Sequence, residues 1–184
     1  GGSTDDLAII NPSKLSKMRA SQICGQCHSV IYSRIGEHED FLEHGFRFRP
    51  GDDLSKTRLH YSDPDNPYRF WSDGMARVSG IEYNGLSESA CYKFGQMSCL
   101  SCHQMHQADD DFRPSSEWAN DQLKLEATDN STCVQCHQDY QDQKLLTAHT
   151  HHAPASSGSN CYNCHMPHTS YGLLKALRSH QIAI

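Results

Sequence analysis

Polar residues dominate the chain, and apolar residues recur at helical spacing only in short stretches. A first helix is predicted over residues 13–36, because Ser13 follows an Asn-Pro turn and can cap it. Further helices are predicted over residues 116–127, 131–148 and 169–179. In the last of these, Leu173, Leu174 and Leu177 are spaced to form one apolar face.

Residues 45–95 have a different pattern, rich in Pro, Gly, Asp and aromatic residues. Their turn signals are too dense for helices, and one hairpin is predicted near residues 77–83. We expect an ordered wrap in which the aromatic side chains pack: Phe46, Phe48, Tyr68, Phe70, Trp71 and Tyr83. The predicted fold class is mostly α with extensive irregular structure, as one domain over residues 1–184.

The composition does not support an ordinary apolar core. Hydrophobic residues make up 36% of the chain, the mean hydropathy is −0.70, and long Val/Ile/Leu runs are missing. No apolar run reaches the roughly 20 residues of a transmembrane helix, and the N-terminal residues do not have the pattern of a signal peptide. Something other than aliphatic side chains is expected to fill the interior.

Eight of the nine cysteines occur in C-x-x-C pairs, and a histidine follows each pair directly. This is the signature of covalent haem attachment: the two thiols bond to the haem vinyl groups, and the histidine binds the iron. Zinc ribbons and disulfides also use paired cysteines, but neither explains the histidines. Cys91 is left over, and a buried thiol is favoured over an intermolecular bridge. The twelve motif residues are Cys24, Cys27, His28, Cys99, Cys102, His103, Cys133, Cys136, His137, Cys161, Cys164 and His165.

Four c-type haems are therefore predicted, attached at residues 24–28, 99–103, 133–137 and 161–165. With 184 residues, about 46 remain for each haem, so we expect the haems to form the core. Without them the chain should be largely unfolded. Because haem is attached covalently outside the cytoplasm, the protein is expected to be periplasmic, extracellular or on a cell surface, after export of a precursor.

Nine histidines remain as candidates for the opposite face of each iron: His38, His44, His60, His106, His149, His151, His152, His168 and His180. His106 and His168 each lie three residues after a motif histidine, too close to reach the far face of the same haem. The cluster at 149–152 precedes Cys161 across a flexible loop and is the best local source of ligands, above all His149 and His152. His180 and His106 are the other metal-ligand candidates. Methionine ligation is possible but less expected.

Several segments resemble the multihaem cytochromes of the nitrite-reductase and hydroxylamine-oxidoreductase superfamily. The similar stretches are "INPSKLSKMRASQICGQCHS", "FRPGDDL", "FWSDG", "EYNGL", "SCLSCHQMH", "HTHHAP" and "CHMPHTSYGLLKALRSHQI". The resemblance implies that His180 binds the haem of Cys99, Cys102 and His103. It also implies that the chain corresponds to the C-terminal tetrahaem part of longer cytochromes. The catalytic haem of those enzymes has a lysine ligand, whereas all four motifs here end in histidine.

The leading functional hypothesis is electron transfer along four mostly bis-histidine haems, without catalysis. The alternative is an oxidoreductase for small nitrogen or sulfur compounds at one five-coordinate haem, and a haem-delivery module is a third class. The net charge of −6 favours basic redox partner proteins over nucleic acid. A homo-oligomer or filament that extends the haem chain is a further expectation. The Asp109–Asp111 run is interpreted as a solvated charge run, not a calcium site.

Overall fold

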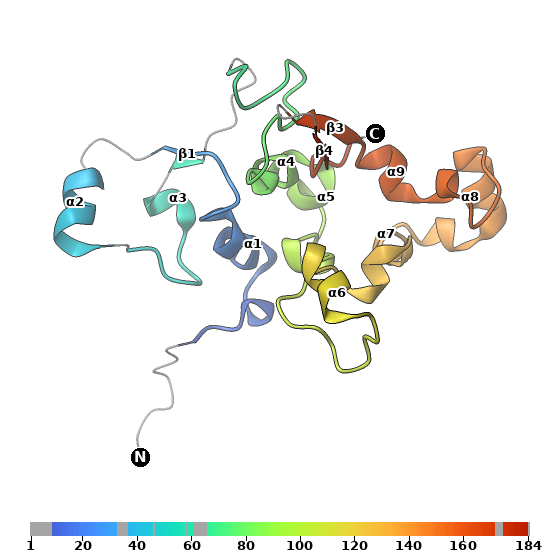
Figure 1. The fold of residues 1–184 in the computed structure, drawn as a ribbon, viewed down its shortest axis with the longest axis horizontal. Helices are drawn as coiled ribbons and strands as arrows, with labels where there is room; N and C mark the ends of the chain where they lie inside the picture. Colours follow the sequence, from blue (N-terminus) through green and yellow to red (C-terminus); the bar gives the residue numbers. More distant parts are fainter. Residues whose placement is uncertain are drawn as a thin grey trace.

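The computed structural model describes residues 9–32, 37–45, 47–57, 59–60, 66–171 and 175–183. The chain is drawn out along one axis, with helix α2 (Glu37–His44) at one end and helix α8 (Gln143–Thr150) at the other (Figure 1). Its accessible surface is 12338 Å², whereas a compact chain of 20.7 kDa exposes about 8,900 Å². The polypeptide alone therefore leaves much more surface open than a normally packed domain. No helix in the described ranges is long and apolar enough to cross a bilayer.

The N-terminal helix is shorter than predicted. Asn11 caps a 3₁₀ turn, η1 (Pro12–Lys14), by accepting a hydrogen bond from the Ser13 amide. The α-helix α1 (Lys17–Gly25) begins only at Ser16, whose side chain accepts a hydrogen bond from the Arg19 amide. The prediction of one helix over residues 13–36 was wrong, because two polar caps divide its start and strand β1 (Ile31–Tyr32) follows.

Residues 45–95, where the turn signals excluded helices, contain three short ones in their described part, and a further helix precedes them. The elements are α2 (Glu37–His44), α3 (Leu54–Thr57), β2 (Leu59–His60), α4 (Glu82–Glu88) and α5 (Ala90–Lys93), and β1 pairs antiparallel with β2. The predicted hairpin near 77–83 does not form; its place is taken by an isolated bridge between Phe70 and Ala76 and by the start of α4. Burial overrides the local signals here, since Tyr83 and Leu86 of α4 pack with Tyr92 of α5.

Short helices also dominate the C-terminal half. They are η2 (Cys99–Ser101), α6 (Ser115–Asp121), η3 (Leu125–Thr128), α7 (Ser131–Val134), η4 (Gln138–Gln141), α8 (Gln143–Thr150), η5 (Ser157–Ser159) and α9 (Cys161–His165). The two longer helices predicted at 116–127 and 131–148 are thus broken. Gln122 takes a left-handed conformation (φ 52°) and ends α6, and Asp142 caps α8 by accepting hydrogen bonds from the Lys144 and Leu145 amides.

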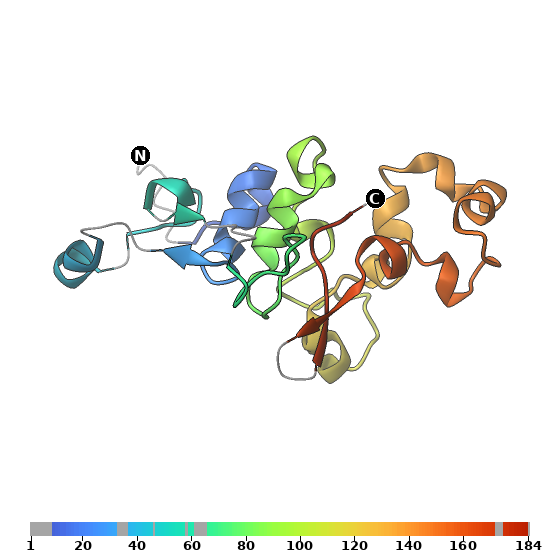
Figure 2. The ribbon, with the colours of Figure 1, turned by 90° about the horizontal axis from the view of Figure 1, so that it is seen from above.

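A hairpin replaces the helix predicted at 169–179. Strand β3 (His168–Tyr171) pairs antiparallel with β4 (Lys175–Arg178), with Thr169 opposite Leu177. Leu173 and Leu174 lie outside the described residues. Thr and Tyr favour strands, and they outweigh the leucine spacing here. The hairpin carries the C-terminal segment back to the middle of the molecule, beside α4 (Figures 1 and 2).

Buried hydrophobic residues are few and unevenly placed. One cluster joins Val30, Phe70 and Ile81, and the other joins the three residues of α4 and α5 named above. Of the ten buried hydrophobic residues in the described part, nine lie between residues 20 and 92. The tenth is Leu146 in α8. The predicted fold class, mostly helical with extensive irregular structure, is confirmed at this level.

Candidate haem-binding site

The four C-x-x-C-H motifs adopt the same local structure, a single helical turn. In the first three, the amide of the motif histidine donates a hydrogen bond to the carbonyl of the first cysteine, at 2.8 Å for His28, 2.9 Å for His103 and 3.0 Å for His137. The fourth motif is the helix α9 itself. Residues one turn apart share a helix face, so each motif presents both thiols and its imidazole together.

The Nδ1 atom of three motif histidines is held by an oxygen. His103 Nδ1 donates to the Asp121 carbonyl at 2.9 Å, and His165 Nδ1 donates to the Ala183 carbonyl at 2.7 Å. His28 Nδ1 instead pairs with the Glu82 carboxylate at 2.9 Å. A hydrogen on Nδ1 leaves Nε2 as the free lone pair, and this is how proteins orient a histidine toward a metal.

Two motif histidines face a second histidine from another segment. The ring centroids of His103 and His180 lie 6.2 Å apart with planes 19° from parallel. Those of His149 and His165 lie 6.0 Å apart with planes 2° from parallel. Two imidazoles on opposite sides of one metal, with bonds of about 2 Å each, have centroids roughly 6 Å apart. The spacing therefore suits an iron between the rings.

Burial and packing favour this arrangement of His180 and His149. Burial lowers the pKa of His180, although the Glu82 carboxylate opposes the shift. The imidazole is therefore neutral at neutral pH, the form that binds iron. His149 lies in the last turn of α8, where the Tyr140 ring packs against it with centroids 4.8 Å apart.

The other histidines are not arranged in this way in the described part of the chain. His106 and His152 are exposed, and His152 packs against Gly158 of the following loop. His44 is exposed and pairs with Asp40 at 3.2 Å. His168 is exposed in β3, and His151 ends α8 in a left-handed conformation. The side chains of His38 and His60 lie outside the described residues.

His137 is exposed beside an open hollow of about 440 Å³. The hollow is lined by Cys136, His137, Gln138, Asp139 and Tyr140. The hollow thus borders the third motif, and it also borders Tyr140, whose ring packs against His149. The hollow offers space beside the motif for a bulky group.

Thiols of neighbouring motifs lie in contact with each other. Cys24 accepts a hydrogen bond from Cys99, which lowers the pKa of Cys24 to about 7 and raises that of Cys99. Burial raises the pKa of Cys133 to about 12, with Cys161 and Cys102 adding to the shift. All nine cysteines are free, and Cys91 is partly buried. The first motif thus adjoins the second, and the third adjoins the fourth.

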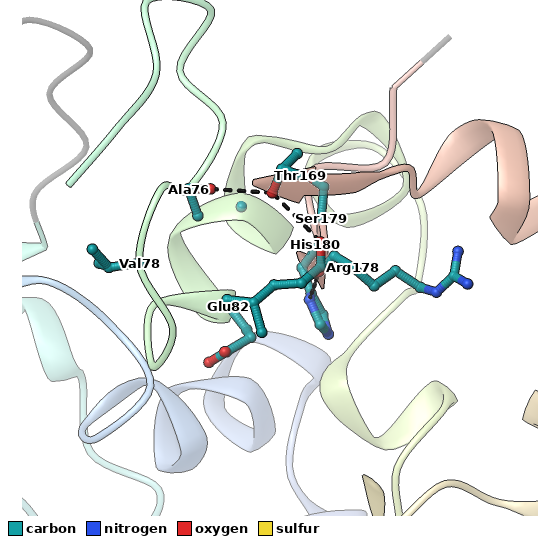
Figure 3. Close-up of a pocket in the computed structure, with 9 residues that line it drawn as sticks. Ala76, Val78, Glu82, Thr169, Arg178, Ser179 and His180 are labelled. Carbon is teal, nitrogen blue, oxygen red and sulfur yellow. Dashed lines mark hydrogen bonds between the residues drawn. The ribbon is translucent and has the colours of Figure 1, made fainter. Parts of the chain in front are cut away.

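Glu82 was not predicted as a functional residue. It shares a small cavity with His180, lined also by the β3–β4 hairpin and the segment around Ala76 (Figure 3). Burial raises the pKa of Glu82, but hydrogen bonds from His28, its own amide and the Gly80 amide outweigh this and leave the pKa below its usual value. The carboxylate is therefore charged at neutral pH. Tyr140 and the carbonyls of Asp121 and Ala183 were missed as well.

The chain matches no protein-family model, no curated protein and no solved structure in the comparisons. Its resemblance to the nitrite-reductase and hydroxylamine-oxidoreductase superfamily thus stays a prediction. Within the described ranges, three or more His, Cys, Asp or Glu side chains do not gather around a point where a bare metal ion could bind. Haem iron needs only two, because the porphyrin supplies its other ligands.

The residues present fit covalently bound haem. Each motif offers two thiols and an imidazole on one turn, and two motifs have an opposing histidine at the spacing of a shared iron. Large apolar side chains are also left open in the polypeptide, such as Phe112 (92% exposed) and Phe94 (87% exposed). Porphyrin rings offer an apolar surface for such side chains.

Proposed function

We propose that the protein is an extracytoplasmic electron-transfer protein that carries four covalent c-type haems. The observation that carries this proposal is the pair of parallel histidine couples, His103 with His180 and His149 with His165. Each couple joins a motif histidine to one from a distant or flanking segment. When bound, haem supplies an iron that changes reversibly between the ferric and ferrous states.

The histidine couples favour electron transfer over catalysis. An iron held between two histidines has no open position for a substrate, so His180 and His149 would keep small molecules away from the second and fourth haems. His103 and His165 would hold those irons from the other side, with their Nδ1 atoms fixed by backbone carbonyls. Such rigid ligands keep the iron environment similar in both oxidation states.

The contacts between motifs support a continuous path. Cys24 contacts Cys99, and Cys133 contacts Cys161. Cys24 and Cys99 would attach the first and second haems, and Cys133 and Cys161 would attach the third and fourth haems. Cys102 of the second motif lies near enough to Cys133 to raise its pKa. The motifs thus adjoin one another in sequence order, and α7 and α9 lie on the same side of α1 along the long axis (Figure 1).

The cellular location of the protein and the charge of its redox partners follow from the same proposal. Covalent haem attachment places it outside the cytoplasm, and the net charge of −6 favours basic redox partners. Electron exchange with such partners should slow as ionic strength rises, since salt screens the attraction between exposed charges.

Single substitutions of the paired histidines test the proposal. In the purified holoprotein, denaturing mass spectrometry should find four covalent haems. His180→Ala and His149→Ala should each turn one low-spin haem high-spin in optical and EPR spectra, without loss of haem. His106→Ala and His152→Ala are the matched controls, because these histidines are exposed and unpaired with another histidine in the described residues, and they should leave the spectra unchanged.

Two results would contradict the proposal. If the spectra stay low-spin in both His180→Ala and His149→Ala, these two histidines are not haem ligands. A wild-type protein with a high-spin ferric signal that shifts on addition of nitrite or hydroxylamine would instead favour an oxidoreductase.

A further inference from the structure

The first motif differs from the others in what holds its histidine. His28 Nδ1 pairs with a carboxylate oxygen of Glu82 at 2.9 Å, whereas His103 and His165 donate to neutral backbone carbonyls. A carboxylate bears a full negative charge, and a carbonyl bears only a dipole. The three histidines therefore have different basicity although their motifs share one backbone turn.

The Glu82 carboxylate is fixed in its place. Its other oxygen, Oε1, accepts a hydrogen bond from the Gly80 amide at 3.0 Å. Gly80 has a positive φ of 79°, which L side chains rarely adopt. The turn before α4 thus holds one carboxylate oxygen, and the other is left for His28. The Glu82 side chain is one-third exposed, so the contact is partly shielded from water.

We propose that Glu82 is a positioning residue that lowers the reduction potential of the haem attached at Cys24 and Cys27. It does so through His28, and it makes this haem harder to reduce than those of His103 and His165. This inference rests on the proposed function, because it concerns the same haem chain. It goes further in giving that chain a low-potential end at the first motif.

Two physical effects act in the same direction. A hydrogen bond to a carboxylate makes the imidazole a stronger electron donor, and a stronger donor stabilises ferric over ferrous iron. The negative charge itself also favours the more positive oxidation state. Of the three oxygens that hold a motif Nδ1, only Glu82 brings such a charge.

The test is a potentiometric titration of the holoprotein, followed optically and by EPR. Glu82→Gln keeps an oxygen that can accept from His28 and removes the charge, so the potential of the first haem should rise most. The potential of the second haem should rise less, because the Glu82 charge also acts on His180 across the small cavity that they share, and the other two potentials should stay. Glu82→Asp restores the charge and should bring the potential of the first haem back toward the wild-type value. A protein with Cys24→Ala and Cys27→Ala lacks the first haem and shows which potential belongs to it.

Glu88→Gln is the matched control. Glu88 lies in the same helix, α4, and pairs with Lys93 at 2.6 Å, away from His28. The substitution removes the same charge from the same helix, and all four potentials should stay unchanged. Circular dichroism and a count of four covalent haems show that each variant is folded and loaded.

The outcomes separate the two proposals. Glu82→Gln with four haems and four unchanged potentials overturns the role of Glu82 and leaves the electron-transfer proposal intact. An equal rise in Glu88→Gln also overturns it, because the effect would then come from overall charge. A wild-type protein without four covalent haems overturns the proposed function, and with it this inference.

Discussion

The two halves of the molecule are built in different ways. Residues 20–92 contain one haem motif and nine buried hydrophobic residues, including both core clusters. Residues 98–183 contain three motifs and one buried hydrophobic residue, Leu146, in the described part. The content of apolar core therefore falls as the density of motifs rises.

The difference indicates what each half depends on. The first half can bury Val30, Phe70 and Ile81 against each other, and part of its structure comes from ordinary side-chain packing. The second half has short helices held by caps and turns, and such helices are unstable in water without packing. We infer that haem supplies the missing apolar contacts there.

Removal of all haem should give the largest effect and should show directly which half of the molecule depends on haem. A variant with all eight motif cysteines changed to Ala cannot attach haem, and it should lose roughly half or more of its helical circular dichroism. Hydrogen exchange should show the loss concentrated in residues 98–183, while α1, α4 and α5 keep partial protection. Equal protection in both halves would contradict this account.

Truncation of a core side chain in the first half should give the next largest effect. Phe70 is 2% exposed in the first cluster, and Phe70→Ala in the holoprotein should lower the free energy of unfolding by about 3–5 kcal/mol. Denaturant unfolding with all haems attached measures it. Phe94→Ala is the comparison variant, because Phe94 is 87% exposed in the polypeptide. A loss of stability in Phe94→Ala would indicate that haem covers this side chain. A neutral Phe70→Ala would mean that haem dominates the first half too.

An ion pair within the first half should give the smallest effect, visible only in acid. Asp53 pairs with Arg19 at 3.2 Å and accepts a hydrogen bond from the Ser55 hydroxyl. The Ser55 and Arg19 contacts lower the pKa of Asp53 from 3.8 to about 2. Its contribution is thus present above pH 4 and is lost as the pH falls toward 2.

The comparison with Asp53→Asn measures this contribution. The wild-type protein should be slightly more stable than the variant at pH 5, and the difference should vanish near pH 2. A difference that persists below pH 2 would assign the effect of Asp53 to a source other than its charge.

Sequence reasoning reached the motif residues because their spacing is a chemical requirement, and in the structure each motif forms a single helical turn. It favoured His149 and His152 over His151 but did not choose between those two, because the choice depends on where α8 ends. That end leaves His149 on the last turn and turns His151 aside. The backbone carbonyls that hold His103 and His165 have no sequence signal at all.

The helix predicted at 169–179 shows a second limit. Its leucine spacing suggested an amphipathic face, but the segment forms a hairpin that lies against the turn at Ala76, where the Thr169 hydroxyl donates to the Ala76 carbonyl. This long-range contact adds to the strand preference of Thr169 and Tyr171, and together they outweigh the leucine spacing. The resemblance to multihaem cytochromes nevertheless paired His180 with His103, and in the structure the two rings lie 6.2 Å apart.

The two histidine couples also differ in when they can form as the chain is made. His149 and His165 are close in sequence, so their couple closes a short loop. His103 waits for His180, near the end of the chain, and closure of so long a loop is slow and costs more entropy. The approach of His180 also requires glycine at position 85, because a Cβ there would lie 2.8 Å from the Gln181 amide nitrogen. If the proposed haems are bound, the second haem would therefore gain its second ligand later than the fourth haem.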